Sequence, residues 1–257
     1  MSGASSARRR PTSLDRPTEA QARLLHAPLR VGGLTPCSAT DWPGQLSAVV
    51  FCQGCPWRCA YCHNPYLLPS RGASELAWCD VLAFLRRRVG LLDAVVFSGG
   101  EPLAQAALPD AVRSVKELGF RVGLHTGGAY PSRLSYLLPF LDWVGLDFKA
   151  PIADYPAITG APGSGQKALA SARVLIRSGV QHEFRTTVHP RWHDATTLLS
   201  MADQLAALGV RRYVLQAFRA QGCADITLEH DAPVTLLEDS RIEKLAHRFE
   251  SFALRAD

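Results

Sequence analysis

The sequence contains no uninterrupted apolar run of the roughly 18 to 20 residues that a membrane-spanning helix requires. No apolar stretch follows the arginines near the start of the chain, as a secretory signal peptide would need. Both absences argue against a membrane protein or an exported one. We therefore expect the protein to be cytoplasmic and to have no membrane partner.

A broad excess of one charge sign is also missing. The formal net charge is +5, but the stretch ARRRP supplies Arg8, Arg9 and Arg10, and the remaining chain is near balance. A nucleic-acid-binding surface is typically strongly basic along one face or one helix. The charge pattern therefore predicts no nucleic-acid partner.

Residues 1–28 lack a sustained apolar period and combine Ser, Pro and charged residues. Segments of this kind cannot bury enough apolar surface to offset the entropy that folding costs. We therefore predict a disordered tail over residues 1–28. The following residues, 29–257, suffice for one domain with a sizeable core, because 47% of the chain is hydrophobic.

The cysteines lack the even, spread-out pattern of a secreted disulfide scaffold. There are seven, and four of them fall within the stretch FCQGCPWRCAYCHNP, at Cys52, Cys55, Cys59 and Cys62. This clustering favours metal or redox chemistry. The other three stand alone in the sequence, and we expect each to be a small buried hydrophobic residue: Cys37, Cys79 and Cys223.

Short apolar stretches followed by turn signals alternate with stretches of helical spacing along residues 29–257. Strands are expected at residues 46–52, 93–100, 121–128, 143–151, 183–190 and 211–218, and helices at 75–90, 108–119, 165–179 and 195–209. This alternation predicts an α/β fold with a parallel sheet. Six units are too few for the usual closed eight-stranded barrel, so we predict a partial (β/α)6 barrel with its site at the carboxyl ends of the strands. A further helix is predicted over residues 236–255, either packed on the barrel or helping to dock the partner.

The four clustered cysteines can be grouped in two ways. A symmetric grouping, Cys52 with Cys55 and Cys59 with Cys62, suggests a structural zinc site. A zinc ribbon, however, normally places a dozen or more residues between its two pairs, and here only Pro-Trp-Arg intervenes. The alternative triplet, Cys55, Cys59 and Cys62, can bind three irons of a [4Fe-4S] cluster and leave the fourth iron open. Cys52 is then an ordinary core residue.

The triplet, with Tyr61 just before its last cysteine, resembles the CxxxCxxC loop of the radical S-adenosylmethionine (SAM) enzymes. In that family the open iron of the cluster chelates the amino and carboxylate groups of SAM. Electron transfer from the reduced cluster then gives a 5′-deoxyadenosyl radical. The resemblance implies that Cys55, Cys59 and Cys62 are the metal ligands and that Tyr61 lies at the cofactor site.

The stretch FSGGEP resembles the GGE motif of the same family, one β-α unit after the cysteine loop. The two glycines allow the backbone to come close to a ligand, because no Cβ is in the way. The resemblance implies contacts from Gly99, Gly100 and Glu101 to the SAM amino group.

Other candidate cofactor-binding residues end later strands. Asp147 and Lys149 share one face of their strand, and they either form an ion pair that caps it or, as in glycyl radical enzyme activating enzymes, border SAM. Arg185 is favoured for SAM because a guanidinium pairs with carboxylate or ribose oxygens. Gln216 is a further pocket candidate. His125 stands where relatives carry the Asp of Asp-Thr-Asn-Gly, so we expect a structural histidine or a pocket group there.

Residues 32–69, 97–105, 147–160 and 184–190 are similar to the anaerobic ribonucleoside-triphosphate reductase activating proteins. This resemblance implies a radical SAM oxidoreductase that removes hydrogen from a glycine of the reductase, with a reduced flavodoxin- or ferredoxin-type electron donor. Residues 63–98 contain only one cysteine, which favours a branch with a single cluster. The alternatives are a radical SAM enzyme acting on a small molecule, similar to 7-carboxy-7-deazaguanine synthase, and a non-enzymatic zinc-binding module.

Overall fold

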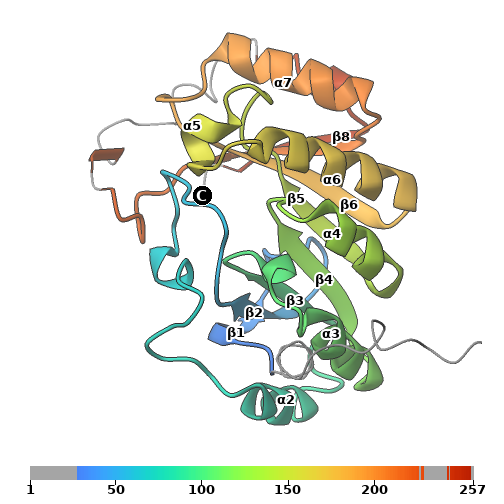
Figure 1. Cartoon of the computed structure of the whole chain (residues 1–257). Coiled ribbons are helices and arrows are strands. Elements are labelled where there is room, and N and C mark those ends of the chain that lie inside the picture. Colours follow the sequence, from blue (N-terminus) through green and yellow to red (C-terminus); the bar gives the residue numbers. More distant parts are fainter. Residues whose placement is uncertain (1–27, 226, 229–241, 243, 256–257) are drawn as a thin grey trace, which may run out of the picture.

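Eight strands follow one another in order across a single curved sheet, and helices lie along its outer face (Figure 1). Strands β2 to β8 pair in parallel, whereas β1 runs antiparallel to β2. The computed structural model describes residues 28–225, 227–228, 242 and 244–255. The tail predicted over residues 1–28 therefore lies, apart from residue 28, outside the described residues.

The six predicted strands are all present. They are β2 (Ser47–Cys52), β3 (Ala94–Gly99), β4 (Arg121–Thr126), β5 (Trp143–Asp147), β6 (Gln181–Val188) and β7 (Arg212–Ala217). Most of their residues are buried, as expected for parallel strands whose two faces are both covered. The α/β fold with a partial parallel barrel is therefore confirmed.

Two strands at the sheet edges were not predicted by the sequence pattern. These are β1 (Val31–Ser38) and β8 (Ser251–Arg255), and β8 shows that the helix predicted over residues 236–255 is wrong in its last part. Phe252 of β8 packs on Tyr213 of β7, with ring centroids 6.1 Å apart. Backbone pairing along β7, together with this cross-strand contact, stabilises a strand where the local apolar spacing favours a helix.

Helices connect the strands and cover the sheet. The four predicted ones are present as α2 (Trp78–Arg86), α3 (Leu108–Glu117), α6 (Ser164–Ser178) and α7 (Ala195–Ala207). The sequence pattern does not predict α4 (Pro131–Leu137) or α5 (Tyr155–Thr159), which are too short to show an apolar period. Short 3-10 segments are η2 (Pro65–Leu67), η3 (Pro102–Ala104), η4 (Leu138–Phe140) and η6 (Ala246–Arg248). No helix within the described residues is long and apolar enough to cross a membrane.

A small apolar cluster lies apart from the main core and consists of Trp42, Val49, Ala94, Val96 and Trp143. The rings of Trp42 and Trp143 stack with centroids 5.5 Å apart. Ala94 and Trp143 are the first residues of β3 and β5, so this cluster lies toward the amino-terminal ends of the strands. Its position leaves the carboxyl ends for polar side chains, as in other barrels of parallel strands.

The three isolated cysteines are less buried than predicted. Cys37 on the edge strand β1 and Cys79 in the first turn of α2 are exposed, and Cys223 is half-buried. The prediction of buried residues is therefore wrong for Cys37 and Cys79. An edge strand and the solvent side of a helix both leave side chains uncovered, and α2 buries Val81 and Leu85 instead.

Candidate functional site

A cavity at the carboxyl ends of the strands brings together most of the residues predicted from sequence. Its lining includes Cys55, Cys59, Tyr61, Cys62, Gly99, Gly100, Glu101, Asp147, Lys149 and Gln216. Trp57, His63, Asn64, Leu68, Gly127 and Thr187 also line it. Of the predicted cofactor-binding residues, only Arg185 does not reach the cavity wall.

The four clustered cysteines separate into three and one. Cys55, Cys59 and Cys62 are partly exposed and line the cavity. Cys52 is the last residue of β2, is fully buried and packs in the main core. Of the four, the triplet thus lines the cavity and Cys52 is a core residue.

The loop that carries the three cysteines is anchored at its base by a buried amide. Gln53 is 1% exposed, and its Nε2 donates to the carbonyls of Tyr66 (3.1 Å) and Pro69 (2.7 Å). The amides of Arg58 and Ala60 donate to the last carbonyls of α5, at 2.8 and 2.9 Å. The loop is therefore held on two sides, which fixes the positions of its thiols.

Five aromatic side chains fasten the same loop to the ends of β6 and β7. Tyr61 contacts Trp192 (5.5 Å between centroids), Trp192 contacts His189 (5.0 Å), His189 contacts Phe218 (4.9 Å), and Phe218 stacks on His63 (5.4 Å). Because Tyr61 and His63 belong to one loop, the contacts form a closed ring. Edge-to-face and offset stacking of this kind stabilises a loop without a hydrogen bond.

The Tyr61 hydroxyl has no hydrogen-bond partner among the described residues, although the side chain is only 4% exposed. The Lys149 ammonium lies 5.8 Å from the centre of its ring. Burial raises the pKa of the Tyr61 hydroxyl, so it stays protonated and can donate. A buried unpaired hydroxyl in a cavity wall is suited to binding a ligand acceptor, because leaving it unpaired is costly.

The turn after β3 lies directly against the start of the cysteine loop. The amide of Gly100 donates to the carbonyl of Cys52 (2.9 Å), and the amide of Glu101 donates to that of Gly54 (2.9 Å). A Cβ on Gly99, where φ is +104°, would lie 2.5 Å from the Cys52 nitrogen, and one on Gly100 would lie 2.4 Å from the Gly54 oxygen. Only glycine fits at either position.

The Glu101 carboxylate is buried behind this turn. Its oxygens accept from Thr126 Oγ1 (2.8 and 2.9 Å), the Leu103 amide (3.1 Å) and the Gly127 amide (3.1 Å). Burial raises the pKa of Glu101 to about 7, although these hydrogen bonds oppose the rise. Thr126 was not identified from the sequence, since a threonine at a strand end gives no signal until the fold brings it beside Glu101.

Asp147 joins two cations at the end of β5. Its Oδ2 lies 3.4 Å from Lys149 Nζ, and its Oδ1 lies 3.1 Å from Arg185 Nη2. Burial would raise the pKa of Asp147, but Lys149 and Arg185 together hold it below its usual value. The pKa of Lys149 is raised despite burial, mainly by Asp147. Carboxylate and both cations are therefore charged at neutral pH.

His125 lies below this group and is paired within the protein. Its Nε2 is 2.7 Å from the Asp41 carbonyl, and its Nδ1 is 3.2 Å from Ser98 Oγ. Burial and the nearby Arg185 charge lower the pKa of His125 to about 4, so it is neutral. It fits the structural alternative, because both ring nitrogens lie within hydrogen-bond distance of protein groups, and Nε2 also lies 3.2 Å from Arg185 Nη1.

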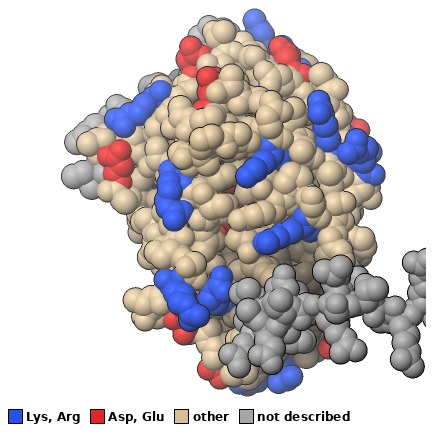
Figure 2. Space-filling view, in the orientation of Figure 1, with Lys and Arg blue, Asp and Glu red and all other residues tan. Residues whose placement is uncertain are grey.

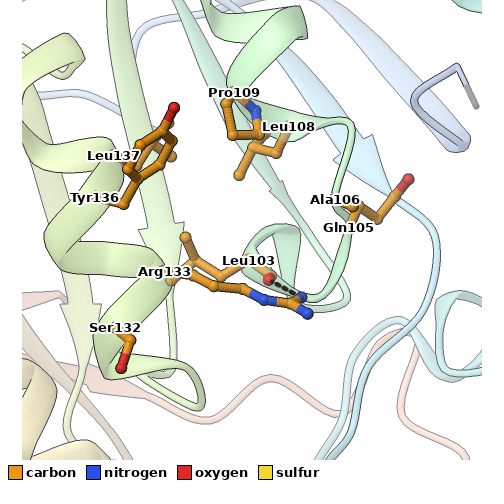
Figure 3. Close-up of a pocket in the computed structure, with 9 residues that line it drawn as sticks. All are labelled: Leu103, Gln105, Ala106, Leu108, Pro109, Ser132, Arg133, Tyr136 and Leu137. Atoms are coloured by element: carbon orange, nitrogen blue, oxygen red, sulfur yellow. Dashed lines mark hydrogen bonds between the residues drawn. The ribbon is translucent and has the colours of Figure 1, made fainter. Parts of the chain in front are cut away.

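A separate apolar groove lies on the outer side of the barrel, between η3, the start of α3, and α4 (Figure 3). Its lining includes Leu103, Leu108, Tyr136 and Leu137, and the Arg133 guanidinium crosses one end, where it donates to the Leu103 carbonyl at 2.8 Å. This groove contains no thiol and no acid. It is therefore distinct from the polar cavity at the strand ends.

The thiols at the cavity suit a cluster better than a single ion. No three or more His, Cys, Asp or Glu side chains in the described part of the chain converge closely enough to hold one metal ion. Structural zinc needs its ligands around one point, whereas each thiolate of a [4Fe-4S] site binds its own iron. Burial raises the pKa of Cys55 to about 12, so cluster assembly must displace the proton.

Residues 49–203 match the family model of the radical SAM superfamily. This match covers more than half of the chain, and the protein belongs to that superfamily. A [4Fe-4S] cluster and SAM are the cofactors of its members, so they are the cofactors of this protein.

The most similar relatives include enzymes that activate glycyl radical proteins. A protein of Methanocaldococcus jannaschii, named provisionally as a glycyl-radical enzyme activating enzyme, is 30% identical over 76% of this chain and 82% of its own length. The pyruvate formate-lyase 1-activating enzyme of Escherichia coli K12 is 30% identical over 64% of this chain and 70% of its own. The chain is therefore homologous to the glycyl-radical enzyme activating enzymes.

The fold likeness extends to a solved structure with bound S-adenosylmethionine. Streptococcus suis SuiB bound to S-adenosylmethionine superimposes with a TM-score of 0.61 and 13% identity, over 79% of this chain and 48% of that one. The chain thus spans about half the length of that structure. At this identity the match supports the shared fold alone.

Proposed function

We propose that this protein activates a glycyl radical enzyme by removing one hydrogen from a glycine of that protein, and that the partner is the anaerobic ribonucleoside-triphosphate reductase. One observation carries the proposal. The cysteine triplet and the Gly-Gly-Glu turn meet at one cavity, in a chain homologous to activating enzymes over most of their length. We also propose that residues 29–257 work as one radical SAM domain.

In this proposal Cys55, Cys59 and Cys62 hold the cluster and leave one iron for SAM. The bound, reduced cluster and SAM together supply a 5′-deoxyadenosyl radical. The protein contributes the three thiols, a cavity at the strand ends, and the exclusion of water from the reacting atoms.

Further side chains would bind SAM itself. The Glu101 carboxylate, held by Thr126 and two amides, receives the positively charged amino group. Lys149 offers a cation for the carboxylate or ribose, with Asp147 as its counter-charge. Gln216, whose Nε2 donates to Thr187 Oγ1 at 2.9 Å, also lines the cavity. The Tyr61 hydroxyl offers one unused donor.

A protein substrate needs room to approach the cavity. Within the described residues, β1 and β8 each pair on one side only, so the barrel is not closed by hydrogen bonds. An extended loop of the partner could enter at this open edge, whereas a closed barrel would restrict access to the strand ends.

The choice of partner rests on sequence similarity. Residues 32–69 and 147–160 are similar to the reductase activating proteins, and residues 63–98 have one cysteine, which supports a single cluster. Pyruvate formate-lyase is the second candidate, because several matched relatives are named as activating enzymes of that protein. A small-molecule substrate is a third possibility that keeps the same cofactors.

An electron donor of the flavodoxin or ferredoxin type is part of the proposal. Figure 2 shows Lys and Arg side chains scattered over one face, near its middle and at its margins, with Asp and Glu mainly at the margins. Such an arrangement favours approach of a negatively charged protein. Because salt screens this attraction, we expect an acidic donor protein to reduce the cluster more slowly at high salt.

Isotope transfer tests the proposal directly. The reconstituted protein is mixed with SAM, a reductant and either candidate partner, produced with glycine deuterated at its α-carbon. We expect deuterium in the 5′-deoxyadenosine formed with the ribonucleotide reductase, by mass spectrometry. Transfer only from pyruvate formate-lyase would reassign the partner, and unlabelled 5′-deoxyadenosine with both would contradict an activase.

A further inference from the structure

Arg185 carries a buried charge close to the cofactor cavity without lining it. The residue is 8% exposed, and its Nε and Nη2 lie 3.2 and 3.1 Å from Oδ1 of Asp147. A guanidinium is costly to bury unless it is paired and hydrogen-bonded. The sequence favours direct contact between Arg185 and SAM, but the structure pairs Arg185 with Asp147 instead.

The surroundings of Arg185 form a fitted space for its guanidinium. A Cβ on Gly145 would lie 2.9 Å from Arg185 Cζ and Nη2, so a glycine is needed on the neighbouring strand. The ring of Trp143, two residues before Gly145 on β5, contacts the His125 ring, with centroids 5.5 Å apart. His125 is neutral and does not compete for Asp147. Asp147 is the one acid that forms an ion pair with Arg185 within the described residues.

Asp147 divides its two oxygens between two cations. Oδ1 faces Arg185 below the cavity, and Oδ2 faces Lys149, which lines the cavity beside Cys59 and Tyr61. Lys149 is further held through its backbone amide, which donates to Tyr155 Oη at 2.9 Å. If Arg185 were absent, both Asp147 oxygens would be free for the Lys149 ammonium, which would be drawn away from the cavity.

We propose that Arg185 is a positioning residue for SAM binding: by engaging Oδ1 of Asp147, it keeps the Lys149 ammonium at the cavity wall. It also keeps the three-residue group at a net charge of +1, which favours an anionic ligand group at the cavity. The proposal concerns SAM binding, which the family shares, and does not depend on the identity of the protein substrate.

Another ion pair on the same strand provides a matched control. Glu183 of β6 is 6% exposed and lies 3.1 Å from Arg255 of β8. Neither residue lines the cavity. Arg255→Met and Arg185→Met therefore each remove one arginine from an ion pair with a carboxylate, but only the second disturbs Asp147.

The experiment compares these variants as cluster-loaded proteins. Iron and sulfide content, melting temperature and the dissociation constant for SAM are measured, the last by calorimetry under anaerobic conditions. We expect both variants to melt at lower temperature. Arg185→Met should weaken SAM binding about tenfold, a typical coupling between residues in contact, while Arg255→Met leaves it within about twofold.

Two further variants separate positioning from folding damage. Arg185→Lys keeps the positive charge and should bind SAM more tightly than Arg185→Met. If Arg185→Met does not fold, the SAM affinity of Arg185→Lys tests the proposal instead. Asp147→Asn combined with Arg185→Met should bind SAM no more weakly than Asp147→Asn alone, because Arg185 acts through Asp147. Wild-type affinity in the Arg185 variants, or additive losses in the double variant, would overturn the proposal.

Discussion

Neighbouring residues of the cysteine cluster have very different surroundings. Cys52 is fully buried at the end of β2, where its backbone also accepts the amide of Gly100. Cys55, only three residues later, lines the cavity with Cys59 and Cys62. Because a cluster ligand must reach the cavity, position within the fold separates the triplet from its neighbour more clearly than spacing does.

Alanine substitutions test this division. Cys55→Ala, Cys59→Ala and Cys62→Ala should each abolish cluster binding, as measured by iron and sulfide content and by SAM cleavage. Cys52→Ala should keep the cluster and lose about 1 kcal/mol of folding free energy, as for removal of a small buried group. Loss of the cluster in Cys52→Ala alone would show that the grouping is wrong.

The unpaired Tyr61 hydroxyl gives a prediction in which stability and binding move in opposite directions. Tyr61→Phe removes a buried donor that lacks a partner, so the cofactor-free protein should be equally stable or more stable. SAM affinity should fall roughly five- to tenfold, the effect of one hydrogen bond of about 1 kcal/mol.

Tyr155→Phe is the matched control for that substitution. Tyr155 is fully buried, and its oxygen accepts the Lys149 amide at 2.9 Å. Its removal should lower the melting temperature, which Tyr61→Phe should not. Equal destabilisation by both variants would mean that the Tyr61 hydroxyl is already satisfied without a ligand.

The raised pKa of Glu101 predicts that SAM binding depends on pH. Burial raises this pKa to about 7, so below pH 7 the carboxyl is protonated and cannot pair with the SAM ammonium group. SAM affinity should therefore weaken as pH falls through 7, and Glu101→Gln should weaken binding and remove this dependence. Calorimetric titrations from pH 6 to 8 measure both, and an unchanged pH profile in Glu101→Gln would point to another group.

At the scale of elements, the turn after β3 and the loop after β2 depend on each other. The Gly100 position has no room for a side chain, since a Cβ would lie 2.4 Å from a backbone oxygen of the cysteine loop. Gly100→Ala should therefore cost about 1 to 3 kcal/mol, as overpacking usually does, and reduce iron loading. Gly33→Ala is the control, because its Cβ would lie at ordinary contact distance, 3.7 Å from Phe51. Equal melting temperatures for the two variants would contradict this dependence.

The elements that sequence predicted correctly are those with strong local patterns. Most of the six central strands centre on short apolar stretches, although β6 is largely polar, and the four long helices show an apolar period. Both edge strands were missed: β1 contains Gly-Gly and Pro, and β8 overlaps a stretch with helical spacing. What makes β8 a strand is its pairing with β7, which no local pattern records.

The site, too, has parts that a local sequence pattern predicts and parts that depend on contacts between distant segments. The cysteine triplet and the Gly-Gly-Glu turn are each contiguous in sequence, so their resemblance to family motifs could be recognised without the fold, and it predicts them as site residues. Thr126 and the closed aromatic ring could not be predicted, because they depend on contacts between distant segments. Thr126 lies 25 residues from Glu101. His63 follows β2, whereas Phe218, on which it stacks, follows β7. Arg185 was identified, but its partner Asp147, 38 residues away, determines where it lies.

At the scale of the whole molecule, the barrel interior is arranged in levels. The stacked Trp42 and Trp143 fill the amino-terminal end, and His125, Arg185 and Asp147 form a polar level above them. The cavity with its thiols lies at the carboxyl ends of the strands. This order closes the amino-terminal end of the barrel with an apolar stack and leaves the strand ends for SAM and a partner loop.

Electron paramagnetic resonance is the most direct test of the proposed activity. The anaerobically reconstituted, reduced protein is mixed with SAM and the anaerobic ribonucleotide reductase of the same organism. We predict a glycyl-type doublet that requires SAM and is lost with Cys55→Ala. Formation of 5′-deoxyadenosine without a doublet on this reductase or on pyruvate formate-lyase would contradict the activase account.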